Sequence, residues 1–151
     1  GYDYIMPSPE LTGVQLASIA EHPALADRML IGIHGRTPLM QLLHCPIKEH
    51  KGCQNCMGIA GAVTDEAGRV FPLVNIRYPD NCLVRMLNCR TTDLIDLFDR
   101  IPQTAGYVLN FVGEQIDEVT ERIAAANEAK NGKRQTQYPN STRGHWMRKV
   151  E

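Results

Sequence analysis

The spacing of the cysteines is the feature that most constrains how this chain can fold. Cys45, Cys53 and Cys56 form a C-x7-C-x2-C pattern, and Cys82 follows a predicted hairpin. A C-x2-C pair lets two sulfurs reach one metal from a single tight turn, and Gly52 eases the backbone bend that this requires. A site with four ligands needs further thiolates. Cys45 and Cys82 are the natural candidates, because a hairpin can return the chain to its starting point.

Counting thiolates leaves several kinds of site open. Four of them suit zinc and an iron–sulfur cluster equally well. Simple zinc ribbons repeat the C-x2-C knuckle on both sides, whereas the knuckle occurs once here, and this asymmetry favours a cluster. The alternatives are buried, inert cysteines or a thiol redox pair. A thioredoxin-like pair is expected to follow a strand and to open a helix, but residues 44–56 are rich in Lys and His and predict a loop.

The composition is that of an ordinary soluble globular protein, with 43% hydrophobic and 22% charged residues among 151. A net charge of −1 indicates no general preference for nucleic acid or membrane. The sequence has no apolar run of the roughly 20 residues that a membrane-spanning helix needs, and no signal peptide is evident. We therefore expect a cytoplasmic protein with reduced thiols. The abrupt start, without an initiator Met, suggests the carboxy-terminal part of a longer chain.

Apolar periodicity predicts a strand–helix–strand unit near the amino terminus. A short strand in residues 3–11 runs into a proline-rich turn, and helical spacing follows until Pro23 stops it. Residues 28–35 are apolar and β-rich, as in a strand that is buried on both faces of a parallel sheet. The crossover of such a unit is right-handed.

The rest of the chain predicts a hairpin, two further helices, a strand and a tail. The hairpin turns at residues 65–68, where Gly68 supplies a positive φ. Thr92 is expected to cap a short helix over 93–101, and residues 106–112 form a strand. The clearest helix covers 114–130. Its expected buried face comprises Ile116, Val119, Ile123 and Ala126.

Four polar residues outside the cysteine segment are candidates for catalysis. His34 lies at the end of a predicted buried strand, where α/β folds place ligands, and Arg36 follows it. His34 suits a general acid–base role and Arg36 suits a clamp on a carboxylate or phosphate. The alternative is a local hydrogen bond for His34 and an acidic partner for Arg36. Glu10 follows the first strand, and His145 lies in the tail.

The tail sequence TRGHWMRKV is a further candidate for substrate binding, together with Arg36. Arg143, His145 and Trp146 could contact a ligand or stack on a base. The alternative is an amphipathic tail whose Trp fills a groove. The sequence contains neither G-x-S-x-G nor HExxH, so it supports neither a serine hydrolase nor a zincin.

Several motifs in order resemble the carboxy-terminal part of peptidase family U32, the collagenase-like peptidases. They are SPEL, IHGRTPLM, HCPI, GCQNC, DEAGRVFPL and TRGHWMRKV. The resemblance implies an α/β fold that contains the last β/α units of a TIM-barrel-like domain, with an inserted cysteine-rich loop and hairpin and an irregular tail. The implied segments are the end of the barrel (1–44), the cluster-binding segment (45–90), a helix–strand–helix return (91–130) and the tail (131–151). The earlier barrel strands would precede this chain.

The resemblance also implies a cofactor and a range of activities. By matched motif, a 4Fe–4S cluster would be held by Cys45, Cys53, Cys56 and Cys82, with zinc as the alternative. Cys89 would not be a ligand. Some relatives are collagen-degrading peptidases, while others look like oxygen-independent hydroxylases of RNA bases or of the ubiquinone ring. We therefore expect an iron–sulfur-dependent enzyme acting on RNA or a small aromatic molecule. The alternatives are a peptidase, or a non-catalytic module that a cluster or zinc stabilises.

Overall fold

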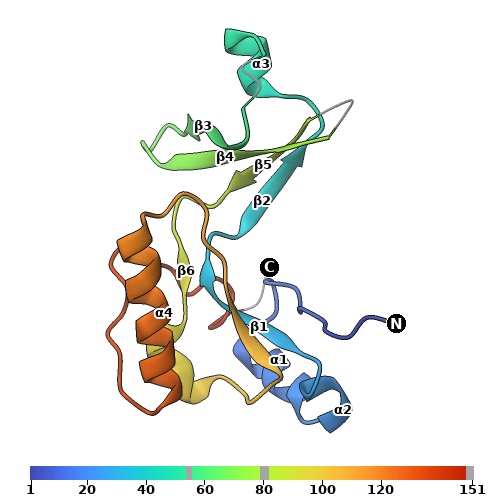
Figure 1. The fold of residues 1–151 in the computed structure, drawn as a ribbon, viewed down its shortest axis with the longest axis vertical. Helices are drawn as coiled ribbons and strands as arrows, with labels where there is room; N and C mark the ends of the chain where they lie inside the picture. Colours follow the sequence, from blue (N-terminus) through green and yellow to red (C-terminus); the bar gives the residue numbers. More distant parts are fainter. Residues whose placement is uncertain (54–55, 79–81, 149–151) are drawn as a thin grey trace. The chain divides into compact units, whose positions relative to one another are not determined.

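The computed structural model describes residues 1–53, 56–78 and 82–148. Its helices are α1 (Gly13–Ala20), α2 (Pro23–Ala26), α3 (Pro46–Lys51), the 3-10 helix η1 (Ile95–Arg100) and α4 (Ile116–Lys130). Its strands are β1 (Leu30–Gly35), β2 (Pro38–Leu42), β3 (Gly58–Thr64), β4 (Val70–Arg77), β5 (Cys82–Leu87), β6 (Thr92–Asp93) and β7 (Gly106–Leu109). They divide into two compact units (Figure 1). Unit 1 comprises Gly1–Gly35 and Thr91–Glu151, and unit 2 comprises Arg36–Arg90.

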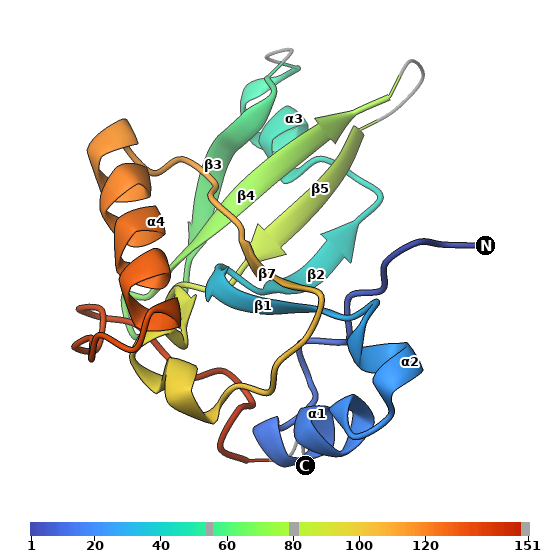
Figure 2. The same ribbon diagram turned by 60° about the horizontal axis from the view of Figure 1, so that its bottom comes forward.

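Unit 1 is built on a small mixed sheet in the order β6-β1-β7. β1 pairs with β7 in parallel and with β6 in antiparallel fashion. A parallel bridge also joins Ile5 to Met29, just before β1. The segment around Ile5, α1 with α2, and β1 therefore follow the predicted strand–helix–strand order. Figure 2 shows β1 and β7 crossing the middle of this unit, with α4 on one side and α1 and α2 on the other.

The ends of α1 follow from its sequence. Thr12 is the N-cap, and its side chain and that of Gln15 form a reciprocal capping box. Pro23 was expected only to stop this helix, but it also occupies the first turn of α2. A proline is favourable there because its missing N–H has no partner in a first turn in any case.

The core of unit 1 gathers side chains from both ends of the chain. Met29, Ile31, Ile33 and Ile95 are at most 2% exposed. Trp146 joins this cluster, so the prediction that the Trp fills a groove is confirmed. Its ring packs on α1, where a Cβ at Gly13 would lie 2.7 Å from Trp146 Cε2.

The predicted buried face of α4 is only partly correct. Ala125, Ala126 and Ala129 are buried, whereas Ile116 is 74% exposed and Ile123 is 46% exposed. Small side chains let a helix approach its neighbour closely, and α4 packs against η1. The helix therefore turns its alanines inward, rather than its largest apolar residues.

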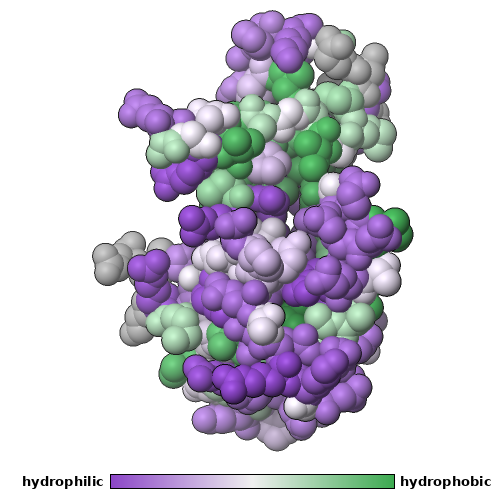
Figure 3. Space-filling view, turned by 90° about the vertical axis from the view of Figure 1, so that its left-hand side faces the viewer, coloured by the Kyte–Doolittle hydropathy of each residue, from purple (hydrophilic) through white to green (hydrophobic). Residues whose placement is uncertain are grey.

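Unit 2 is a four-stranded antiparallel sheet in the order β2-β5-β4-β3. The predicted hairpin is confirmed as β3 and β4, and Gly68 in its turn has a φ of 75°. The backbone N–H of Arg69 hydrogen-bonds the Asp65 carboxylate and lowers the pKa of Asp65. Figure 3 shows hydrophobic side chains over the upper part of the drawn face. Exposed side chains of this sheet include Ile59, Val63 and Val70.

Three predicted elements differ from the structure. The cysteine segment was expected to be a loop, but Pro46–Lys51 forms α3. Unit 2 begins at Arg36 rather than at residue 45, because β2 pairs with β5 and belongs to the same sheet. Thr92 lies in β6 and caps no helix. The Asp93 carboxylate instead accepts a hydrogen bond from the backbone N–H of Ile95, at the start of η1.

The described residues form a mixed α/β structure and no closed barrel. None of the helices within them is both long and apolar enough to cross a membrane. The tail is irregular as expected, with a bridge between Thr92 and Thr142, and residues 149–151 of the predicted tail lie outside the described part.

Candidate functional site

The cysteine-bearing segment packs on one face of the unit 2 sheet. Cys45 is the N-cap of α3, and Pro46 lies in the first turn. The Cδ1 atom of Ile47 lies 3.5 Å from the position that a Cβ would take at Gly61. Gly61 is opposite Leu73, and directly opposed residues project from the same face of a sheet. The segment therefore covers the face that carries Leu73, where Gly61 leaves room for Ile47.

Two of the predicted ligands meet at one buried amide. Nδ2 of Asn75 donates a hydrogen bond to Sγ of Cys56 at 2.9 Å, and it lies 4.0 Å from Sγ of Cys45. Asn75 is only 5% exposed, and its Oδ1 has no hydrogen-bond partner among the described residues. Both cysteines are half-buried. Residues that lie eleven positions apart in the sequence are thus brought to the same polar group.

The strand register places Cys82 on the same face. Asn75 is opposite Val84, and Arg77 is opposite Cys82. Residues two apart in a strand project from the same side, so Asn75 and Cys82 share a face as diagonal neighbours. In antiparallel sheets such neighbours are typically about 7–8 Å apart. Three of the four predicted ligands therefore belong to one face of unit 2.

The full four-cysteine set is not assembled. Cys53 is exposed. Among the described residues, no three His, Cys, Asp or Glu side chains lie close enough together to hold one metal ion. Residues 54 and 55, between Cys53 and Cys56, lie outside the described part. The thiol of Cys89 hydrogen-bonds Oδ1 of Asn88, so this residue has a local partner of its own.

The residues present fit a thiolate-ligated metal or cluster. A neutral thiol is only a weak acceptor, whereas a thiolate sulfur accepts charge-assisted hydrogen bonds. The donor from Asn75 therefore suits ligated sulfurs at Cys56 and Cys45. Hydrogen bonds to the sulfurs are also one of the means by which proteins set the properties of such centres.

A second buried polar group lies in unit 1, at the end of β1. Nδ1 of His34 donates to Oδ2 of Asp93 at 2.7 Å, and the two side chains are 2% and 0% exposed. Oδ1 of Asp93 accepts from the N–H of Ile95, so both carboxylate oxygens are engaged. Because the proton is on Nδ1 in this arrangement, the lone pair of a neutral imidazole lies on Nε2.

Aromatic rings hold the imidazole of His34 in place. The ring centroid of Phe111 is 5.1 Å away, and that of Tyr138 is 5.7 Å away with an edge-on orientation. The guanidinium of Arg122 lies 4.5 Å from the centre of the Tyr138 ring. Burial raises the pKa of Tyr138, and nearby Glu118 raises it further. The imidazole is thus fixed in orientation, which is what a general base or a polar ligand contact requires.

Arg36 is held by the backbone of its own unit. Nη1 donates to the carbonyl oxygens of Asn88, at 2.9 Å, and of Cys89, at 2.6 Å. These bonds join the start of unit 2 to its end. The predicted alternative, an acidic partner, is replaced by two carbonyl acceptors, and this nitrogen is committed to them rather than to a ligand.

Arg143 has an equally clear structural role. Its guanidinium forms a two-pronged ion pair with Asp96 and donates to the carbonyl oxygen of Asp93 at 2.8 Å. It therefore ties the tail to η1 and β6. Of the other candidates, His145 is half-buried in the turns of the tail, and Glu10 is exposed in a turn before α1.

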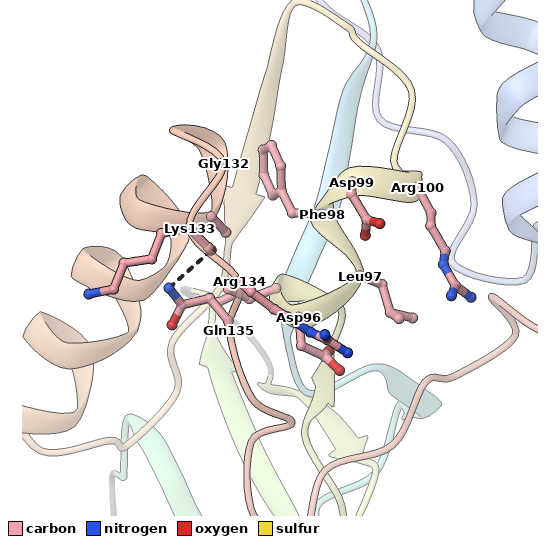
Figure 4. A pocket seen from close by; sticks show the side chains of 11 residues that line it. Asp96, Leu97, Phe98, Asp99, Arg100, Gly132, Lys133, Arg134 and Gln135 are labelled. Atoms are coloured by element: carbon pink, nitrogen blue, oxygen red, sulfur yellow. Dashed lines mark hydrogen bonds between the residues drawn. The ribbon is translucent and has the colours of Figure 1, made fainter.

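A pocket of about 540 Å³ lies elsewhere in unit 1, between η1 and the segment that follows α4 (Figure 4). Its charged lining includes Asp96, Asp99, Arg100, Lys133 and Arg134. Asp96 is already paired with Arg143, and Lys133 is paired with Glu128. None of the predicted site residues is among the described residues that line this pocket.

Sequence reasoning missed Asn75 and Asp93. Both are buried, Asn75 within the segment PLVNIR and Asp93 within the segment TTDLIDLF, half of which is polar. For Asn75, a polar residue between apolar neighbours was the available signal, whereas Asp93 had no comparable signal. The partner of each comes from a distant part of the chain, so spacing along the sequence could not identify it.

Comparison with known proteins adds no relative. No protein-family model, curated protein or solved structure matches the chain.

Proposed function

We propose that this chain is the cluster-binding, carboxy-terminal part of an iron–sulfur-dependent enzyme. Cys45, Cys53, Cys56 and Cys82 would hold a 4Fe–4S cluster. The observation that carries this proposal is the Asn75 amide, buried and within reach of the sulfurs of Cys45 and Cys56. The sharing of one sheet face by Asn75 and Cys82 supports it further.

The reaction that we propose is hydroxylation of an RNA base or of a small aromatic molecule. Support for this choice comes from the family resemblance of the motifs in the sequence. When bound, a cluster of this kind supplies one-electron transfer or activation of a substrate. Among the chain's own residues, His34 is suited to accept a proton or a hydrogen bond at Nε2, because Asp93 holds its other nitrogen.

We also propose that unit 1 is the end of a TIM-barrel-like domain. The segment around Ile5, β1 and β7 run in parallel, as barrel strands do. α1 and α2 precede β1, whereas unit 2, β6 and η1 lie between β1 and β7. No described strand pairs with the second edge of β7. In a closed barrel every strand has a neighbour on both sides, so earlier strands of a longer chain would complete the sheet there.

Two alternative functions are each favoured by a specific observation. A collagenase-like peptidase is favoured by the His34–Asp93 pair, because hydrolases orient a basic imidazole with a carboxylate in this way. A non-catalytic, zinc-stabilised module is favoured by the position of the cysteines, which join α3 to the sheet. Gelatin cleavage by the anaerobically prepared protein would support the first alternative. One zinc per chain in colourless protein would support the second.

The deciding experiment is metal analysis of protein that is expressed and purified without oxygen. We expect brown protein with about four irons per chain. Cys53→Ser and Cys82→Ser should each lose the iron, whereas the matched control Cys89→Ser should retain it. Colourless wild-type protein with one zinc would contradict the cluster. Equal loss of iron from all three variants would contradict the ligand assignment.

A further inference from the structure

The buried amide of Asn75 has a polarity that apolar packing does not explain. Asn75 projects from the face of β4 that also carries Leu73, and Val84 is opposite it. Leu73 is 2% exposed and Val84 is fully buried. A leucine at position 75 would extend this apolar layer. The asparagine instead leaves its Oδ1 buried without a partner among the described residues, which is unfavourable.

The orientation of the amide indicates what the site must contain. The NH2 end, which can only donate, is directed at Sγ of Cys56 and lies within reach of Sγ of Cys45. A thiolate has no proton to donate and accepts strongly, whereas a thiol is a weak acceptor. The amide is therefore complementary to charged sulfurs, which is the form that cysteine takes as a metal ligand.

We propose that Asn75 is a positioning residue of the metal centre, donating N–H···S hydrogen bonds to the thiolates of Cys56 and Cys45. This role for Asn75 adds a residue to the site beyond the four cysteine ligands. The proposal rests on the proposed function. The two donors of the NH2 group allow one bond to each sulfur. Such bonds withdraw negative charge from the ligands, so they make a bound cluster easier to reduce.

The test is the reduction potential of the cluster in wild type and in Asn75→Leu, each in the full chain. Leucine keeps the branched shape and the number of heavy atoms of asparagine but removes the donor. The ratio of reduced to oxidised cluster at a fixed potential should fall about tenfold, which corresponds to about 59 mV for one electron. The matched control is Asn88→Leu, since the side chain of Asn88 accepts hydrogen bonds from Cys89 and from the backbone of Arg90 within the described residues. Its potential should remain that of wild type.

Two outcomes would overturn the proposal. The first is an unchanged potential in Asn75→Leu with full iron content. The second is an equal shift in Asn75→Leu and Asn88→Leu. Where the leucine variant does not fold, Asn75→Ala also lacks the donor, and an unchanged potential in that variant is equally decisive.

A cobalt experiment separates failure of this proposal from failure of the cluster assignment. If wild-type protein binds zinc instead of iron, the cluster is wrong, but the hydrogen bonds to sulfur are still testable. In cobalt-substituted protein the sulfur-to-cobalt charge-transfer band should move to lower energy in Asn75→Leu and stay in place in Asn88→Leu. An identical band in all three proteins would refute the role of Asn75. A wild-type chain that binds neither iron, zinc nor cobalt would refute both proposals.

Discussion

The His34–Asp93 pair predicts a large and local loss of stability when the carboxylate is removed. Both side chains are almost completely buried, and the carboxylate accepts from His34 and from the backbone N–H of Ile95. In Asp93→Ala, both donors are left in the interior without an acceptor. Each buried donor that loses its acceptor typically costs about 1–3 kcal/mol, and two donors are affected here. Small domains are stable by only about 5–15 kcal/mol, so unit 1 should become marginal.

Asp93→Asn should be milder, because it keeps the acceptor for Ile95 and reverses the hydrogen bond with His34. The amide oxygen can still accept from Ile95, while its NH2 group faces Nδ1 of His34. The imidazole must then carry its proton on Nε2 and accept at Nδ1. The expected cost is about 1–3 kcal/mol, and the change of tautomer should be visible in the nitrogen chemical shifts of the ring.

Trp146 provides the assay for both variants. It is the single tryptophan of the chain and lies in the core of unit 1. Urea unfolding followed by its fluorescence therefore reports on the unit that contains the pair. The control is Asp99→Ala, an exposed acid of η1, which should change the free energy of unfolding by less than about 0.5 kcal/mol.

A double-mutant cycle decides whether the two side chains act as a pair. We expect the variant that combines His34→Ala with Asp93→Ala to be more stable than the sum of the single changes implies. Additivity within about 0.5 kcal/mol is the behaviour of independent sites. Additive single and double variants, or an unchanged unfolding curve for Asp93→Ala, would show that the two side chains do not stabilise unit 1 as a pair.

Two further predictions concern packing and the tail of unit 1. Gly13→Ala should destabilise the protein by about 1–3 kcal/mol in urea unfolding, because the new Cβ would collide with the Trp146 ring, although alanine is the better helix former. An increase in stability would show that the ring can move aside at little cost. Arg143→Lys should also destabilise, by about 1–3 kcal/mol, because lysine lacks the planar fork that pairs with both oxygens of Asp96. If this variant keeps wild-type stability but loses binding of RNA, Arg143 is a ligand contact and not a structural tie.

Local sequence signals predicted the elements whose stability is largely local. The hairpin around Gly68 follows from turn chemistry, and the position of α4 follows from the helical spacing of apolar residues over 114–130. The strand β1 follows from an apolar run. In contrast, β2 has mostly exposed residues, so it shows no alternation of buried and exposed positions. It is a strand because β5 pairs with it, and that pairing is not encoded within residues 38–42.

Two of the three errors within predicted elements share one physical origin. For α4, periodicity selected the large apolar residues, but the neighbour η1 is approached through small alanines. For Thr92, a typical capping residue precedes a helical segment, yet antiparallel pairing with Gly35 of β1 places it in a strand. For α3, the Lys and His content of the segment favoured a loop, although Pro46 is a residue that commonly starts a helix. In the first two cases, contacts from a distant segment decide which of several local possibilities is realised.

The two buried polar groups do not carry equal weight as evidence for function. His34 and Asp93 satisfy one another, and Ile95 and two aromatic rings complete their surroundings. A need for stability alone can account for them. Asn75 differs because its oxygen has no partner among the described residues and its nitrogen points at sulfur. Residues that break a local rule without a structural gain tend to mark functional sites. Asn75 breaks such a rule, and ligation of a metal by a Cys56 thiolate, as proposed above, would supply the missing gain.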